Sequence, residues 1–125
     1  MPVRSTVLAA TVLALVLAAG AQATAPRGTL TGFVTRGPIT PVCVVEQPCD
    51  EPAANVTLLF TRNGSVLGRT VTDANGHYRV RLPVGAFLVG RPSARAPDRR
   101  LDPNRVRVYT ARRTRIDFSI DTGIR

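Results

Sequence analysis

From Thr24 onward, apolar and polar residues alternate in short runs that turn-forming residues separate. The clearest runs are HYRVRL (77–82), RVRVYT (105–110) and TRIDFSID (114–121), in which alternate residues are apolar. A period of two places apolar side chains on one face of a strand, and no window of this part has an apolar stripe with the period of a helix. The pattern therefore predicts an all-β protein.

We expect about seven strands in a single antiparallel Greek-key β-sandwich of the prealbumin-like or immunoglobulin-like kind. The predicted strands are Thr29–Arg36, Asn55–Thr61, Ser65–Thr72, His77–Leu82, Ala86–Gly90, Arg105–Thr110 and Thr114–Asp121. The predicted core residues are Val56, Leu58, Phe60, Tyr78, Val80, Leu82, Phe87, Val89, Val106, Val108, Ile116, Phe118 and Ile120. A two-residue turn at Asn63 and Gly64 would pair Leu58 with Arg69 on the core face, so we also expect a bulge or a longer loop near Gly68.

The first 23 residues have a different character. Arg4 precedes an apolar run from Val7 to Ala19, and the triplet Ala21–Ala23 with small residues at both ends follows. Because this run is shorter than the about 20 residues of a membrane span, we expect a signal peptide at 1–23 and one secreted domain at 24–125 without a stable membrane anchor. An uncleaved N-terminal anchor helix is the alternative.

The two cysteines, Cys43 and Cys49, lie in a proline-rich insert at 37–52. In an oxidising compartment we expect them to form an intramolecular disulfide. A metal site needs more ligands than two thiols and the distant His77, and five intervening residues exceed the spacing of a thioredoxin-type redox pair. The disulfide is therefore favoured, and we expect neither a metal nor another cofactor.

Two consecutive turn motifs lie in VTDANGHYRVRLPVGAFLV (71–89). This stretch resembles the carboxypeptidase regulatory-like, or transthyretin-like, domain of small secreted bacterial proteins, which carries Thr-Asp-x-x-Gly-x-Tyr/Phe followed by Leu-Pro-x-Gly-x-Tyr/Phe. The matching residues are Thr72, Asp73, Gly76, Tyr78, Leu82, Pro83, Gly85 and Phe87. The specific signature covers this stretch alone, and the wider resemblance extends from Thr29 to Asp121.

The resemblance implies a prealbumin-like sandwich that serves as an accessory, adhesive or carbohydrate-binding-like module. The turn residues Asp73, Gly76, Pro83 and Gly85 would then be structural, with Asp73 capping backbone amides. The hydrolase branch of transthyretin-like proteins uses several histidines and a Tyr-Arg-Gly-Ser ending, whereas this chain has one histidine and ends in DTGIR. We therefore expect a non-enzymatic binding, adhesive or structural protein, with a carbohydrate-binding-like accessory module as the alternative and a small hydrolase third.

Other candidate chemistry is weak. His77 with Asp73 and either Ser65 or Ser93 could be imagined as a hydrolytic triad, but neither serine lies in a nucleophile-elbow sequence. The segment DANG lacks the further oxygen ligands of a calcium loop. Sugar-binding platforms need exposed rings, and we expect only Tyr109 to be available. We therefore predict no catalytic residues.

The 17 basic residues are all arginine and face 8 acidic residues, for a net charge of +9. Removal of the segment containing Arg4 would leave about +8. A GC-rich coding bias, together with the family resemblance, points to a bacterial chain and offers a bland explanation for the arginines. The absence of lysine excludes lysine Schiff bases and lysine isopeptide crosslinks.

The arginines also suggest a binding surface. We expect the last two strands to form a hairpin whose outer face is rich in arginine. The candidate anion-binding residues are Arg105, Arg107, Arg112, Arg113 and Arg115. Because guanidinium groups bind phosphate and carboxylate bidentately, the hypothesis is that this face docks on an acidic cell-wall polymer, a glycan, an anionic lipid surface or an acidic protein. Export argues against nucleic acid. Arg79 and Arg81 also point outward, but the sequence does not say whether they join this face.

We predict that the exported protein begins at Thr24, because Ala21 and Ala23 satisfy the small-residue rule for cleavage. Intact mass spectrometry of the protein recovered outside the cytoplasm measures this directly. Recovery of a membrane-bound product that retains residues 1–23 would contradict both the cleavage and the secreted location.

Overall fold

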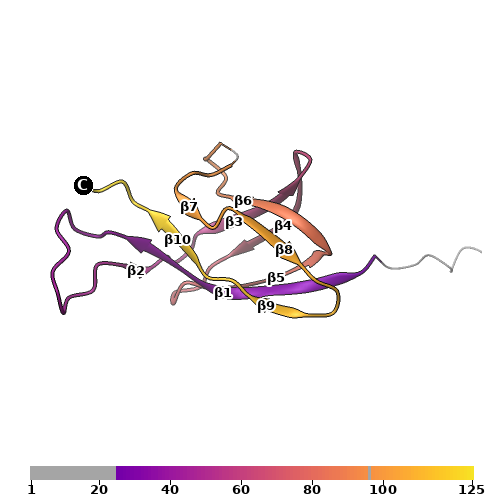
Figure 1. Ribbon diagram of the computed structural model, residues 1–125, viewed down its shortest axis with the longest axis horizontal. Helices are drawn as coiled ribbons and strands as arrows, with labels where there is room; N and C mark the ends of the chain where they lie inside the picture. Colours follow the sequence, from indigo (N-terminus) through magenta and orange to yellow (C-terminus); the bar gives the residue numbers. More distant parts are fainter. Residues whose placement is uncertain (1–24, 96) are drawn as a thin grey trace, which may run out of the picture.

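The computed structural model describes residues 25–95 and 97–125, and the predicted signal segment lies outside them. Ten strands form two sheets that pack face to face (Figure 1). They are β1 (Arg27–Gly37), β2 (Glu51–Pro52), β3 (Thr57–Arg62), β4 (Ser65–Val71), β5 (His77–Pro83), β6 (Gly85–Gly90), β7 (Leu101–Asp102), β8 (Arg105–Val108), β9 (Arg113–Arg115) and β10 (Phe118–Asp121). This part of the chain has no helix with the length and hydrophobicity to cross a membrane. The predicted all-β sandwich is confirmed.

One sheet is antiparallel, with strand order β4-β3-β6-β8, and the other is built around β1. The first half of β1 pairs with β5 on one edge and with β9 on the other, and its second half pairs with β2 and β10. β9 and β10 run parallel to β1, a pairing that the purely antiparallel expectation did not include. Every predicted strand is present in part, the last being divided into β9 and β10, and the two-residue strands β2 and β7 are additional.

The core lies between the sheets and contains the predicted residues, of which only Val56 and Ile116 are partly buried. Four further members were not predicted: Leu30, Val34, Ala53 and Leu101. Threonine and glycine separate the apolar residues of β1 and weaken its alternation, and Ala53 and Leu101 lie in or beside two-residue strands without a pattern. Burial of each large apolar side chain stabilises the fold by about 1.5–3 kcal/mol.

The turn motif at 72–76 joins the two sheets. Asp73 Oδ1 accepts hydrogen bonds from the backbone amides of Asn75 and His77, both at 2.9 Å. Buried Thr72 donates to the carbonyl of Ala53 and accepts from the amide of Val56. Gly76 has a φ of 79°, and a Cβ there would collide with a carbonyl oxygen of β1. The capping role predicted for Asp73 is therefore confirmed.

The β3–β4 hairpin turns at Asn63 and Gly64, which both have positive φ. The register shifts between Phe60 and Thr61, opposite Gly68 and Val66, so that Leu58 pairs with Thr70. The irregularity predicted near Gly68 is confirmed as a bulge. It keeps Arg69 on the solvent side of the sheet.

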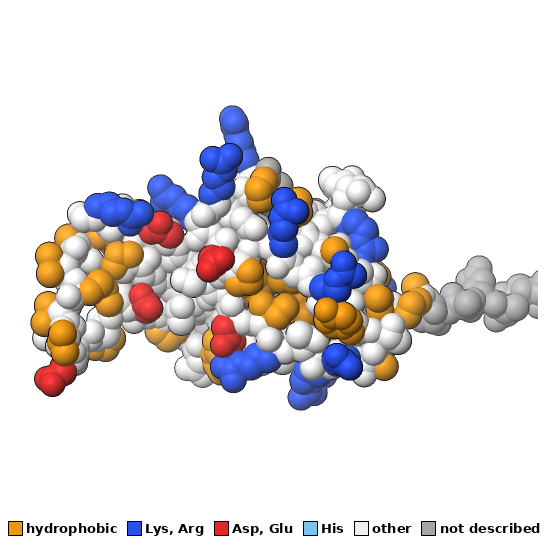
Figure 2. Space-filling model, viewed as in Figure 1, with side chains coloured by type: hydrophobic (Ala, Val, Ile, Leu, Met, Phe, Trp, Pro, Cys, Tyr) orange, Lys and Arg blue, Asp and Glu red, His pale blue; other side chains and the backbone are white. Residues whose placement is uncertain are grey.

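The insert between β1 and β2 projects from one end of the sandwich (Figure 1). Cys43 and Cys49 form the predicted disulfide, with their Cα atoms 5.5 Å apart. The side chains of Val42, Val44 and Val45 between and beside them are exposed, and Figure 2 shows this end of the molecule rich in hydrophobic side chains. The disulfide thus closes a loop that has little packing of its own.

The loop between β6 and β7 is organised by Asp98, which is only 2% exposed. Arg91 donates two hydrogen bonds to its carboxylate, at 2.7 and 3.0 Å, and the amide of Arg100 donates a third at 3.1 Å. The hydrogen bonds from Arg91, more than any other contact, hold the pKa of Asp98 below its ordinary value. This ion pair is the buried electrostatic interaction of the loop.

We predict that the double change Cys43→Ser and Cys49→Ser lowers the melting temperature while circular dichroism shows unchanged strand content. Loss of a small disulfide loop costs about 2 kcal/mol on the chain-entropy estimate, and the insert lies outside both sheets. Free thiols detected by alkylation in unreduced exported protein would contradict the pairing.

We also predict that Asp98→Asn lowers the free energy of unfolding by about 2–3 kcal/mol at pH 7, because it removes one partner of a largely buried pair. A carboxyl whose folded pKa is lowered stabilises the fold above pH of about 4 and loses that contribution as the pH falls through the folded pKa. Urea unfolding at pH 7 and pH 3 should therefore show a smaller deficit at pH 3.

The matched control is Glu51→Gln, which breaks the exposed ion pair with Arg36 and should cost less than about 1 kcal/mol. Equal deficits for the two variants, or a deficit for Asp98→Asn that does not change with pH, would contradict the assignment.

Candidate functional site

The outward orientation predicted for Arg105 and Arg107 is present: both are exposed on β8, alternating with buried Val106 and Val108. The predicted final hairpin, however, is wrong. β8 pairs with β6 in the four-stranded sheet, whereas β9 pairs with β1 in the other sheet. The five candidate arginines therefore do not share one hairpin face. The connection between the two strands crosses from one sheet to the other instead of turning back.

Arg115 is engaged locally. It donates two hydrogen bonds to Asp117, at 3.0 and 3.2 Å, and its guanidinium lies 5.7 Å from the centre of the Phe33 ring. Arg115 lowers the pKa of the Asp117 carboxyl, and the backbone amide of Phe33 contributes to the same shift. Arg115 is thus the least available of the predicted anion-binding residues.

The crossing places Arg112 and Arg113 beside strands far from them in sequence. Two hydrogen bonds fasten the turn to β1: the amide of Ala111 donates to Arg27 O at 2.8 Å, and the amide of Thr29 donates to Arg112 O at 2.9 Å. A side chain at Gly28 would collide with the Tyr109 carbonyl, so the turn can approach β1 only because glycine is there.

The register around Thr29 defines a row of residues across the sheet. Thr29 pairs with Arg81 of β5 on one side and with Arg113 of β9 on the other. Arg79 lies on the same exposed face of β5 as Arg81. Because the Thr29 side chain is short, the longer arginine side chains on both sides of it form the walls of a depression.

This depression has a volume of about 350 Å³, and we call it the arginine groove. Its five arginines are Arg27, Arg79, Arg81, Arg112 and Arg113, and its other lining residues are Gly28, Thr29 and Ala111. The ion pairs found among residues 25–95 and 97–125 involve Arg36, Arg91, Arg115 and Arg125, and none involves an arginine of the groove. The groove is therefore a concentration of unneutralised positive charge.

Sequence reasoning found this site only in part. It named Arg112 and Arg113 as candidates and placed Arg79 and Arg81 outward, but it did not connect the two pairs. Arg27 was missed because the predicted first strand begins at Thr29, whereas β1 begins at Arg27. The pairing of β1 with both β5 and β9 unites them.

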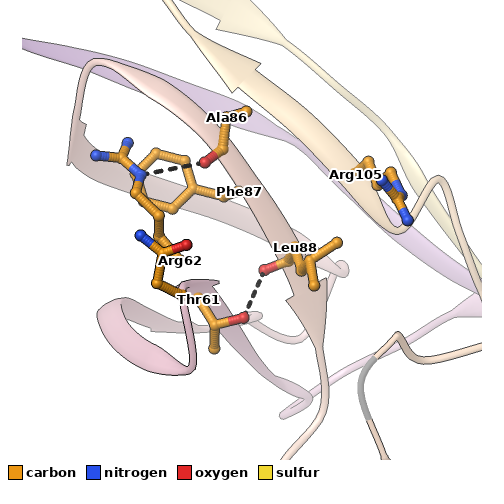
Figure 3. Close-up of a pocket in the computed structure, with 7 residues that line it drawn as sticks. Thr61, Arg62, Ala86, Phe87, Leu88 and Arg105 are labelled. Carbon is orange, nitrogen blue, oxygen red and sulfur yellow. Dashed lines mark hydrogen bonds between the residues drawn. The ribbon is translucent and has the colours of Figure 1, made fainter.

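A second depression, of about 510 Å³, lies on the outer side of the four-stranded sheet beside Arg62 and Arg105 (Figure 3). Arg62 lies 4.3 Å from the centre of the Phe87 ring and donates to the carbonyls of Ala86 at 3.2 Å and Val84 at 3.0 Å. Its Nε and Nη2 atoms are thus used within the fold. The other charged residue that lines this depression is Arg105, whose side chain forms no hydrogen bond with the described residues.

The groups considered for catalysis have structural contacts. His77 Nε2 lies 3.1 Å from Thr31 Oγ1, and its ring meets Phe33 edge-on at 5.2 Å. Hydrogen bonds from the backbone, that of His77 first, hold the pKa of Asp73 below its ordinary value. Ser65 begins β4 in the other sheet. No group of three or more potential metal-binding His, Cys, Asp or Glu residues occurs in the described part of the chain.

No family model matches this sequence, and no curated protein matches it. The minor pilin GBS52 of the gram-positive pathogen Streptococcus agalactiae is a structural match with a TM-score of 0.52 and 11% identity, over 78% of this chain and 45% of the pilin chain. A DUF3823 family protein from Parabacteroides merdae matches with a TM-score of 0.47 and 14% identity, over 78% of this chain and 47% of the other.

The present chain thus spans less than half the length of either solved chain. At 11% identity, the likeness to the pilin concerns the fold alone. It is consistent with the two-sheet β-sandwich described above.

Proposed function

We propose that this protein is an exported, non-enzymatic β-sandwich module that binds acidic surfaces outside the cytoplasm. The observation that carries the proposal is the set of unneutralised guanidinium groups of the arginine groove. Like charges held this close repel one another and weaken the folded state, and an anionic partner relieves that repulsion. Figure 2 shows further basic side chains distributed over the sandwich body, which would steer such a partner toward the protein.

Export is supported by two independent features. The N-terminal segment has the composition of a signal peptide, and the Cys43–Cys49 disulfide is typical of an oxidising compartment. The chain also resembles the carboxypeptidase regulatory-like domain, and this resemblance is part of the proposal because such domains occur in secreted proteins. A pilin shares the fold, in agreement with an adhesive or structural role.

Binding of an anion is favoured over binding of a sugar, because arginine side chains lie against the exposed aromatic rings on which a sugar would stack. Tyr109 is 45% exposed, as expected, but the Arg112 guanidinium lies 5.5 Å from its ring centre. Phe33 is exposed as well and contacts His77 and Arg115. A pyranose would have to displace these contacts, whereas an anion would bind the Arg112 guanidinium directly.

The proposal predicts that the exported protein is retained on immobilised polyanions at about 0.15 M salt, and that retention weakens steeply as salt increases. The measurement is elution from dextran sulfate and polyglutamate columns along a salt gradient, with unmodified dextran as the neutral control. Elution from both polyanions together with the neutral control at about 0.15 M salt would overturn the proposal.

A further inference from the structure

We propose that the arginine groove is a binding site for the phosphate groups of a phosphodiester polymer of the cell envelope. The inference deepens the proposed function and rests on it. It assigns binding to one place, formed by Arg27, Arg79, Arg81, Arg112 and Arg113. Arg105 and Arg107 lie on the other sheet and have no part in it.

The walls of the groove face each other across β1. Arg81 and Arg113 both pair with Thr29, so two strand spacings, about 10 Å, separate their Cα atoms. Arg79 and Arg81 are two residues apart on one strand, a separation of about 7 Å. Long side chains from both walls can therefore approach one anionic group above Thr29, and neighbouring anions can occupy successive positions along the strands.

Phosphate suits this arrangement better than carboxylate. Both groups accept two parallel hydrogen bonds from a guanidinium. A carboxylate is planar and presents its two oxygens on one edge, whereas the phosphate of a diester is tetrahedral and directs its two free oxygens to different corners. Guanidinium groups on opposite walls, such as those of Arg81 and Arg113, can therefore bind the same phosphate.

Charge balance favours a polymer over a single phosphate ion. Five guanidinium groups line the groove, and one phosphate neutralises only part of that charge. A chain that carries one charge per repeat supplies several anions within one molecule and gains from their shared attachment. No aromatic side chain lines the groove, so it offers no platform on which nucleic-acid bases could stack.

A lipid surface fits less well. The groove is hollow, and its lining contains no large apolar side chain that could enter a bilayer. The exposed valines of the disulfide-closed insert follow the end of β1, whereas the groove surrounds its start. Ten residues of extended strand, about 33 Å, separate these two ends. These exposed valines therefore lie away from the groove and do not surround it.

The test compares two triple variants with the same loss of charge. The groove variant is Arg27→Gln, Arg81→Gln and Arg113→Gln. The control is Arg69→Gln, Arg105→Gln and Arg107→Gln on the four-stranded sheet. All six residues are exposed and none forms an ion pair within the described chain. Circular dichroism and melting temperature establish that both variants are folded.

Binding of a fluorescent glycerol phosphate polymer is titrated at several salt concentrations. We expect the groove variant to bind at least about tenfold more weakly, and its slope of log K against log salt to be smaller by about 2, since about three phosphate contacts are lost. The control variant should change affinity less than about threefold. Equal losses in both variants would mean that net charge alone determines binding and would overturn the site, while the proposed function would stand.

Two further measurements distinguish a phosphodiester polymer from a carboxylate polymer and from a lipid surface. If the unchanged protein is retained on polyglutamate but does not bind the glycerol phosphate polymer, the phosphodiester assignment is wrong and the proposed function survives. If phosphatidylglycerol vesicles bind more tightly than the polymer and lose binding in the groove variant alone, the partner is a lipid surface and the polymer assignment is wrong. Failure to bind every polyanion would overturn both proposals.

Discussion

The pairing of β1 along both of its edges is the interaction on which the rest of the structure depends. Its first half lies between β5 and β9 and its second half between β2 and β10, so one strand joins four segments that are far apart in the sequence. Backbone groups buried in a sheet must be hydrogen-bonded, and β1 satisfies them only when the C-terminal strands return parallel to it. The Tyr78 hydroxyl completes this arrangement by donating at 2.6 Å to the Ile116 carbonyl, between β9 and β10.

The arginine groove is a consequence of this pairing. The strands that meet at β1 carry Arg79, Arg81 and Arg113 on their outer faces, and Thr29 between them is too short to fill the space. The ion pairs of the described residues lie outside the groove, as those of Asp98 with Arg91 and of Asp117 with Arg115 do. The fold therefore gathers positive charge without an internal counter-charge, which is the usual condition of a surface that meets an anionic partner.

The most distinctive part of the sequence is structural. The residues that resemble the carboxypeptidase regulatory-like signature form turns and core: Asp73 caps amides, Gly76 permits close approach to β1, and the aromatic residues are buried between the sheets. Such residues specify a sandwich that proteins of unlike sequence share, as the pilin comparison illustrates at 11% identity. Function on a common scaffold depends on the side chains that its surface displays, and our proposal assigns it here to the arginines of the groove.

The sequence by itself determined most of each longer strand, the tight turns at 63–64 and 73–76 and the side chains of β5 and β8 that face outward, because alternation and turn chemistry are local properties. It correctly placed the bulge at Gly68, the cap at Asp73 and the outward arginines of β5 and β8. Only the tertiary structure decided which strands are neighbours. The short connection at 109–112 has the length of a hairpin turn, yet it crosses between sheets because Gly28, eighty residues earlier, leaves room for it against β1. Alternation carries no information about such distant partners, so the hairpin face with Arg105 and Arg115 was mispredicted and the groove with Arg27 emerged from the fold.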